Sequence, residues 1–139
     1  MSHFTKVKTR IMDLEALCKA LDKLGYAYTA AEVGSTVAVR GYQGNAIDAK
    51  ISIHTGEYDI GVVVDKDGVA LAVDVYSLVA DWWGIEDETG CTETEIVNRI
   101  LKMYGFVKVV TACTAQGYEV GEPEVRADGS VQVMATQWN

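Results

Sequence analysis

The chain contains few cysteine, histidine or proline residues, and it lacks a long hydrophobic run. Its 139 residues include three cysteines, two histidines and one proline. The cysteines are odd in number, widely spaced and without a Cys-x-x-Cys motif, which argues against a disulfide framework and a thiolate metal cluster. The longest apolar runs, at 60–64 and 69–73, are far shorter than the roughly 20 residues that span a membrane. We therefore expect no metal site, no cofactor and no membrane location.

The start of the chain also lacks a charged and then apolar leader with a small-residue cleavage site. Together with the cysteine usage, this predicts a cytoplasmic protein. Apolar residues make up 49% and charged residues 23% of the chain, the mixture of a soluble globular protein. We find no internal repeat, low-complexity segment or linker, so we expect a single domain over residues 1–139.

Basic residues are scarce beyond the first twelve residues of the chain. The formal net charge is −8, and the segment 57–95 holds eleven acids against one base, Lys66. Binding to nucleic acid depends on neutralising phosphates with Lys and Arg, so we exclude a nucleic-acid partner. The acidic segment fits either a basic protein partner or simple solubility.

The first half of the chain combines strand and helix patterns. Alternation of long basic with apolar side chains predicts a strand over 4–10. Asp13 stands at the N-cap position of an amphipathic helix that ends at Gly25. Three further β-prone runs, separated by glycine-containing turns, predict short strands at 26–32, 36–40 and 49–54.

Two hairpin turns follow, at 54–57 and 66–68. They predict strands over 58–64 and 69–75, whose continuous apolar character suggests a central or doubly covered position in a sheet. The next segments predict one or two helical turns over 76–83 and an exposed acidic loop over 84–90.

The last third begins with a capping box formed by Thr92 and Glu95, which predicts a long helix ending at Gly117. Gly105 would allow a kink or break in this helix, and the β-branched residues of 106–111 leave a strand as the alternative. Two strands then pair around a turn at 127–130. Because most connections are hairpins, the sequence predicts an α+β two-layer sandwich, with a largely antiparallel sheet and two main helices on one face.

Four blocks of the sequence carry a resemblance to a known family. They are Ser-His-Phe-Thr-Lys-Val-Lys-Thr at 2–9, Val-Arg-Gly-Tyr-Gln-Gly at 39–44, Tyr-Asp-Ile-Gly at 58–61, and the C-terminal stretch from Gln116 to Trp138. Together they resemble the "hypothetical chloroplast reading frame thirty-five" family of cyanobacteria and red-algal plastids. The resemblance implies a helix over 106–111, and it implies no reaction, because the family has no settled activity. Departures at 62–64 and 82–84 indicate a divergent bacterial or phage member rather than a plastid one.

The loop at 40–44 is the first candidate site. Its two glycines let backbone amides approach a ligand, Arg40 offers a forked cation, and Tyr42 offers a stacking face with a hydroxyl. With the neighbouring hairpin, the candidate ligand-binding residues are Arg40, Gly41, Tyr42, Gln43, Gly44, His54, Tyr58 and Asp59. The alternative is a glycine-rich turn in which Arg40 pairs with a surface acid.

His54 and Asp59 lie near opposite ends of a turn, and a histidine beside carboxylates is able to act in acid–base chemistry. No nucleophile or oxyanion site accompanies them in the sequence. We therefore expect no catalytic residues and no enzymatic activity.

Three tryptophans form the remaining candidate site, an interface. Trp82 and Trp83 are adjacent and cannot both face the core, so we expect one of them at the surface, and Trp138 lies near the C-terminus. The first functional hypothesis is an acidic interaction module that forms a homo-oligomer or docks a protein partner. The alternative is a binder of an anionic metabolite or signalling nucleotide near Arg40 and Tyr42, which in a phage member would sequester a host defence signal.

Overall fold

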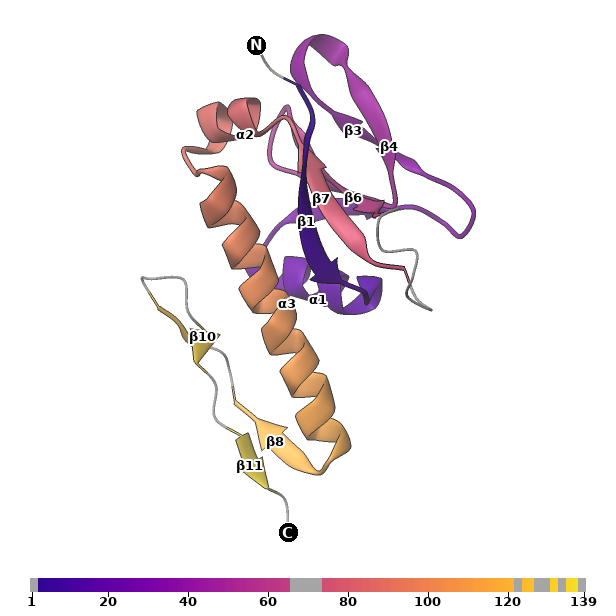
Figure 1. Cartoon of the computed structure of the whole chain (residues 1–139). Coiled ribbons are helices and arrows are strands. Elements are labelled where there is room, and N and C mark those ends of the chain that lie inside the picture. The colour runs from indigo at the N-terminus through magenta and orange to yellow at the C-terminus, as the bar shows by residue number, and fades with distance from the viewer. Residues whose placement is uncertain (1–2, 66–73, 122–123, 127–130, 133–134, 138–139) are drawn as a thin grey trace.

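One antiparallel sheet organises the molecule, and the computed structural model describes residues 3–65, 74–121, 124–126, 131–132 and 135–137. The strand order is β1-β7-β6-β5-β2, with every neighbouring pair antiparallel. Figure 1 labels β1, β7 and β6 of this sheet. The strands are β1 Thr5–Ile11, β2 Ala27–Ala30, β5 Ile51–His54, β6 Asp59–Val64 and β7 Tyr76–Ala80. The three helices are α1 Leu14–Leu24, α2 Trp82–Thr89 and α3 Glu93–Ala115.

Helix α1 forms where the sequence predicts it. The Asp13 carboxylate accepts a hydrogen bond from the backbone N–H of Ala16 at 3.0 Å, which satisfies one of the free donors of the first turn. Gly25 ends the helix in the left-handed conformation, with φ of 82°. Leu17 and Leu21 point from one side of the helix into the core.

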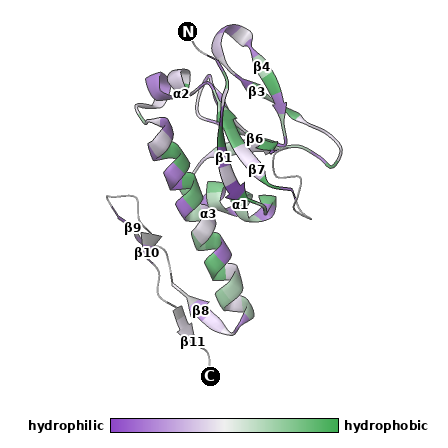
Figure 2. Cartoon of the chain, viewed as in Figure 1, coloured by the Kyte–Doolittle hydropathy of each residue, from purple (hydrophilic) through white to green (hydrophobic). Residues whose placement is uncertain are grey.

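The apolar face of the sheet packs against α1 and α3. Alternate residues of β5 and β6 point to this face, and they join one buried cluster with residues of both helices. From the sheet the cluster takes Ile51, Ile53, Ile60, Val62 and Leu78, and from the helices it takes Leu17, Leu21, Ile96 and Ile100. Figure 2 shows hydrophobic residues gathered in β6 and along α3. The predicted α+β class, with an antiparallel sheet and both main helices on one face, is confirmed.

The opposite face of the sheet carries Ser52, Asp59, Gly61 and Val79, and a second hairpin covers it. Strands β3 (Val37–Arg40) and β4 (Ala46–Ala49) pair with each other and pack on β5 and β6. The approach is close at Gly61, where a Cβ atom would lie 2.8 Å from Val39 Cγ2. Any larger residue at position 61 would push the hairpin away from the sheet. The sequence does not predict this extra layer.

Two predicted segments are wrong. Residues 76–80 form strand β7, not helical turns, and residues 82–89 form α2, not a loop. All five residues of β7 are buried because the strand lies between β1 and β6 with both faces covered, so no alternation marks it as a strand. Helix α2 begins at the Asp81 N-cap and ends at Gly90, with φ of 75°. The predicted strand over 69–75 lies mostly outside the described residues.

Helix α3 runs without interruption from the predicted capping box to Gly117, whose φ is 88°. It passes through Gly105, so neither a break nor the alternative strand over 106–111 is found. Beyond it lie two antiparallel pairs, one at the end of α3 away from α2 and the other alongside α3 (Figure 1). They join β8 (Tyr118–Val120) to β11 (Ala135–Gln137) and β9 (Glu124–Val125) to β10 (Val131–Gln132). This agrees with the predicted hairpin, although its turn at 127–130 is outside the described residues.

Gly105→Ala should stabilise the protein by about 1 kcal/mol, because glycine is the poorer helix former and this position is exposed. A Cβ atom at Gly105 would have no heavy atom within 4 Å. Gly25→Ala is the matched control, and it should destabilise the protein because its φ of 82° disfavours a side chain. Urea unfolding measures both changes. A loss of stability in Gly105→Ala would contradict a regular helix at this position.

Candidate functional site

The candidate site is built around the carboxylate of Asp59, whose side chain is 1% exposed. Asp59 begins β6 on the polar face of the sheet, directly opposite His54 of β5. Its Oδ2 accepts hydrogen bonds from the backbone N–H and the Nε–H of Arg40, both at 2.9 Å. Its Oδ1 accepts from Arg40 Nη2 at 2.9 Å. One buried carboxylate thus fastens the end of β3 to the sheet by three hydrogen bonds.

The charge on Asp59 is stabilised by these partners. Burial alone would raise the pKa of Asp59, but the hydrogen bonds from Arg40 and His54 favour the ionised form and lower the pKa to about 2. The same hydrogen bonds and charge raise the pKa of Arg40. Arg40 and Asp59 therefore form an ion pair throughout the ordinary pH range.

His54 connects Asp59 to Thr29, a residue that no sequence pattern indicates. The His54 Nδ1 atom lies 2.8 Å from Asp59 Oδ1, and His54 Nε2 lies 2.8 Å from Thr29 Oγ1. A carboxylate only accepts, so Nδ1 carries the proton toward Asp59, and in the neutral ring Nε2 accepts from the Thr29 hydroxyl. Thr29 is exposed on the edge strand β2.

The turn between β5 and β6 is tied to α2. Glu88 of α2 accepts hydrogen bonds from Thr55 Oγ1 at 2.9 Å and from the backbone N–H of Glu57 at 2.7 Å. The ring of Tyr58 lies against Gly84, where a Cβ atom would come within 2.4 Å of it. Tyr58 therefore packs against α2. Arg40, His54 and Asp59, in contrast, meet on the sheet.

The loop at 41–44 is the connection between β3 and β4. It contains the short helix η1 (Tyr42–Gly44), with positive φ of 53° at Gln43 and 79° at Gly44. Gly41 lies against the ring of Phe4, where a Cβ atom would approach to 2.6 Å. The backbone N–H of Tyr42 donates to Asp81 Oδ2 at 3.3 Å. The loop is thus held from two sides, by Phe4 of the N-terminal segment and by the N-cap of α2.

Arg40 is less available to a ligand than the sequence suggests. Its Nε and Nη2 donate to Asp59, and Nη2 also donates to the carbonyl of Gly56 at 2.7 Å. The sequence leaves open the alternative that Arg40 pairs with an acid. Arg40 does pair with an acid, Asp59, although Asp59 is buried rather than at the surface. An anion at Arg40 would have to compete with a carboxylate already bound by the same guanidinium.

The adjacent tryptophans have different surroundings. Trp82 is buried, with 7% exposed, and its indole N–H donates to the Thr5 carbonyl at 2.8 Å. Trp83 is 65% exposed, and Tyr42 is 39% exposed. The expectation that one of the two tryptophans lies at the surface is confirmed. We call the surface of Tyr42 and Trp83, which flank Asp81, the aromatic end. Trp138 lies outside the described residues.

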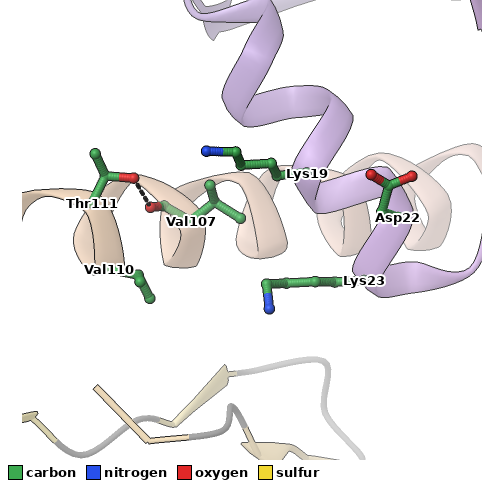
Figure 3. A pocket seen from close by; sticks show the side chains of 6 residues that line it. All are labelled: Lys19, Asp22, Lys23, Val107, Val110 and Thr111. Atoms are coloured by element: carbon green, nitrogen blue, oxygen red, sulfur yellow. Dashed lines mark hydrogen bonds between the residues drawn. The ribbon is translucent and has the colours of Figure 1, made fainter. Parts of the chain in front are cut away.

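A separate cavity of about 380 Å³ lies between α1 and α3. It is lined by Lys19, Asp22, Lys23, Val107, Val110 and Thr111 (Figure 3). The Thr111 hydroxyl donates to the Val107 carbonyl at 3.0 Å, so this lining hydroxyl is already bonded within α3. None of the predicted site residues that the structure describes lines this cavity.

Within the part of the chain that the structure describes, no group of three or more His, Cys, Asp or Glu residues is placed to hold a metal ion. None of the described helices is long and apolar enough to cross a membrane.

The fold and site define a small α+β protein in which an ion pair between a half-exposed arginine and a buried carboxylate fastens a hairpin to a sheet. The chain belongs to the family described as "Protein of unknown function (DUF1257)", whose model matches residues 20–134. It is similar to the "Uncharacterized protein ycf35" of Pyropia yezoensis, with 25% identity over all of this chain and 99% of the relative. The proteins of that name in Guillardia theta and Cyanophora paradoxa are 27% and 28% identical, each over 99% of this chain and 98% of the relative. No solved structure matches the chain.

Asp59→Asn should remove a pH dependence of stability. An unfolded Asp has a pKa of about 4, whereas the pKa of Asp59 is lowered to about 2 in the fold. Ionised Asp59 therefore stabilises the fold above about pH 4, and this contribution is lost as the pH falls through about 2. The variant should lose about 2 kcal/mol at neutral pH and show a shallower dependence at acidic pH. Urea unfolding from pH 7 to 2 measures both effects.

Asp48→Asn on β4 is the control, because Asp48 is exposed. It should keep the pH dependence of the wild type. Equal slopes for the wild type and Asp59→Asn between pH 4 and pH 2 would show that the ion pair does not hold the hairpin.

Proposed function

We propose that the protein is an interaction module that docks a protein partner, or a second copy of itself, through the aromatic end. The observation that supports this most directly is the exposure of Trp83, at 65%. A second exposed aromatic residue, Tyr42, bonds through its backbone N–H to Asp81, the N-cap of the helix that carries Trp83. Tryptophan and tyrosine are enriched among the residues that contribute most to binding energy at interfaces. Docking itself requires no reaction.

The aromatic end is held rigidly, which supports the same proposal. Trp82 and Ile85 bury one side of α2, so the intervening Trp83 faces outward. Asp81 is buried and bonds both the Tyr42 N–H and the first turn of α2. Binding costs less ordering free energy when the contact residues are already fixed in place.

The charge around the aromatic end indicates which partner would fit. Glu86 and Asp87 are exposed on α2, and the chain as a whole carries a net charge of −8. A basic surface on the partner would be attracted to this end, and a lysine or arginine would also be able to stack on an aromatic face.

The departures from the plastid-type pattern at 62–64 and 82–84 support a bacterial or phage origin for the protein.

A small anionic ligand near Arg40 and Tyr42 remains the alternative function. The geometry gives it less support, because Nε and Nη2 of Arg40 already donate to Asp59 and Gly56. We therefore propose docking first.

Trp83→Ala should weaken the complex at least tenfold, because loss of a central aromatic contact costs more than about 1.4 kcal/mol of binding. Sedimentation velocity of the purified protein detects self-association, and quantitative affinity capture from the native host detects a partner. Val109→Ala is the control, since Val109 is a similarly exposed apolar residue on α3. A complex that survives Trp83→Ala at its wild-type abundance would contradict the proposal, as would a wild-type protein that forms no complex.

A further inference from the structure

Three polar side chains form a continuous line of hydrogen bonds across three adjacent strands. Asp59 lies on β6, His54 on β5 and Thr29 on β2, in the order in which the sheet places these strands. The Asp59 Oδ1 to His54 Nδ1 distance is 2.8 Å, and the His54 Nε2 to Thr29 Oγ1 distance is 2.8 Å. The line runs from a buried carboxylate to an exposed hydroxyl.

This is the order of groups that activates a hydroxyl in acyl-transfer enzymes: carboxylate, imidazole, hydroxyl. We propose that the line activates Thr29 as a nucleophile toward activated carboxylic esters of small acids. Asp59 holds the Nδ1–H of His54, which leaves Nε2 free to accept a proton from Thr29. Arg40 bonds the same carboxylate and so positions the group that orients His54.

Exposure along the line suits this chemistry. Asp59 is buried, the His54 side chain is 34% exposed, and Thr29 is exposed on the edge strand. A substrate can therefore reach Thr29 from solvent, while the carboxylate that orients the imidazole is shielded from it.

The reaction proceeds in two half-reactions. The Thr29 oxygen attacks the ester carbonyl carbon as His54 Nε2 takes the hydroxyl proton. The bond from the carbonyl carbon to the leaving oxygen then breaks, and His54 returns the proton to that oxygen, which yields an alcohol and acyl-Thr29. Water repeats the sequence on acyl-Thr29, releasing the carboxylic acid and restoring the hydroxyl. No oxidant or reductant takes part.

This activity goes beyond docking at the aromatic end and does not depend on it. It would also revise the expectation of no enzymatic activity, which rests on the lack of a nucleophile beside His54 in the sequence. The structure places the hydroxyl of Thr29 there, from a strand 25 positions earlier in the chain.

The test uses the unaltered full-length protein and p-nitrophenyl acetate. Release of p-nitrophenolate is followed by absorbance, and peptide mass spectrometry locates the acetyl group after a brief reaction. We expect acetyl-Thr29. Because the mapping is done on the wild type, the result does not depend on the folding of any variant. Acetyl groups on lysines without acetyl-Thr29 would overturn the proposal.

Variants then separate the roles. Thr29→Ala should release p-nitrophenolate more slowly than the wild type. Thr29→Ser should keep the wild-type release, because serine retains the hydroxyl with less crowding. His54→Ala should lower the acetylation rate on the order of a hundredfold, the usual contribution of a general base. Thr94→Ala is the control, an exposed threonine on α3. Equal release by Thr29→Ala, Thr94→Ala and the wild type would also overturn the proposal.

Discussion

The ion pair between Arg40 and Asp59 is the contact on which the polar side of the molecule depends. The sheet has one apolar face, covered by α1 and α3, and an opposite face that combines the polar residues Ser52 and Asp59 with Gly61 and Val79. The β3–β4 hairpin covers it, and its fixed points are the close approach at Gly61 and the three hydrogen bonds that Asp59 accepts from Arg40. A buried carboxylate is costly unless it is paired and hydrogen-bonded, so Asp59, at 1% exposed, depends on its partner Arg40.

The ion pair also organises what lies next to it along the chain. Two residues beyond Arg40, the N–H of Tyr42 meets Asp81, the N-cap of the helix that exposes Trp83. On the sheet, the same Asp59 carboxylate orients His54, which reaches Thr29. The aromatic end and the line of polar side chains are therefore both linked to one buried acid, although they face different parts of the surface and support separate proposals.

Where local patterns decide the structure, the sequence predicts it well. The Asp13 cap, the Gly25 stop and the Thr92–Glu95 capping box act within a few residues of chain, and α1 and α3 form as predicted. Residues 76–80 are predicted wrongly because a strand buried on both faces loses the alternation of apolar and polar residues. The candidate residues Arg40, His54 and Asp59 do meet. His54 and Asp59 lie opposite each other in a hairpin that the sequence predicts, whereas Arg40 reaches Asp59 only through the packing of the β3–β4 hairpin on the sheet, which no local pattern encodes. Thr29 is missed for the same reason, since only the pairing of β2 with β5 brings it to His54.

The most direct test of this account is a double-mutant cycle between Arg40 and Asp59, measured as the free energy of unfolding at neutral pH. The variants are Arg40→Met, Asp59→Asn and their combination. We expect a coupling of about 2 kcal/mol, because the guanidinium of Arg40 donates two hydrogen bonds to the Asp59 carboxylate and pairs with its charge, and Arg40→Met removes both bonds. If the two single changes add to within about 0.5 kcal/mol of the double variant, the ion pair does not hold the hairpin on the sheet, and the account is wrong.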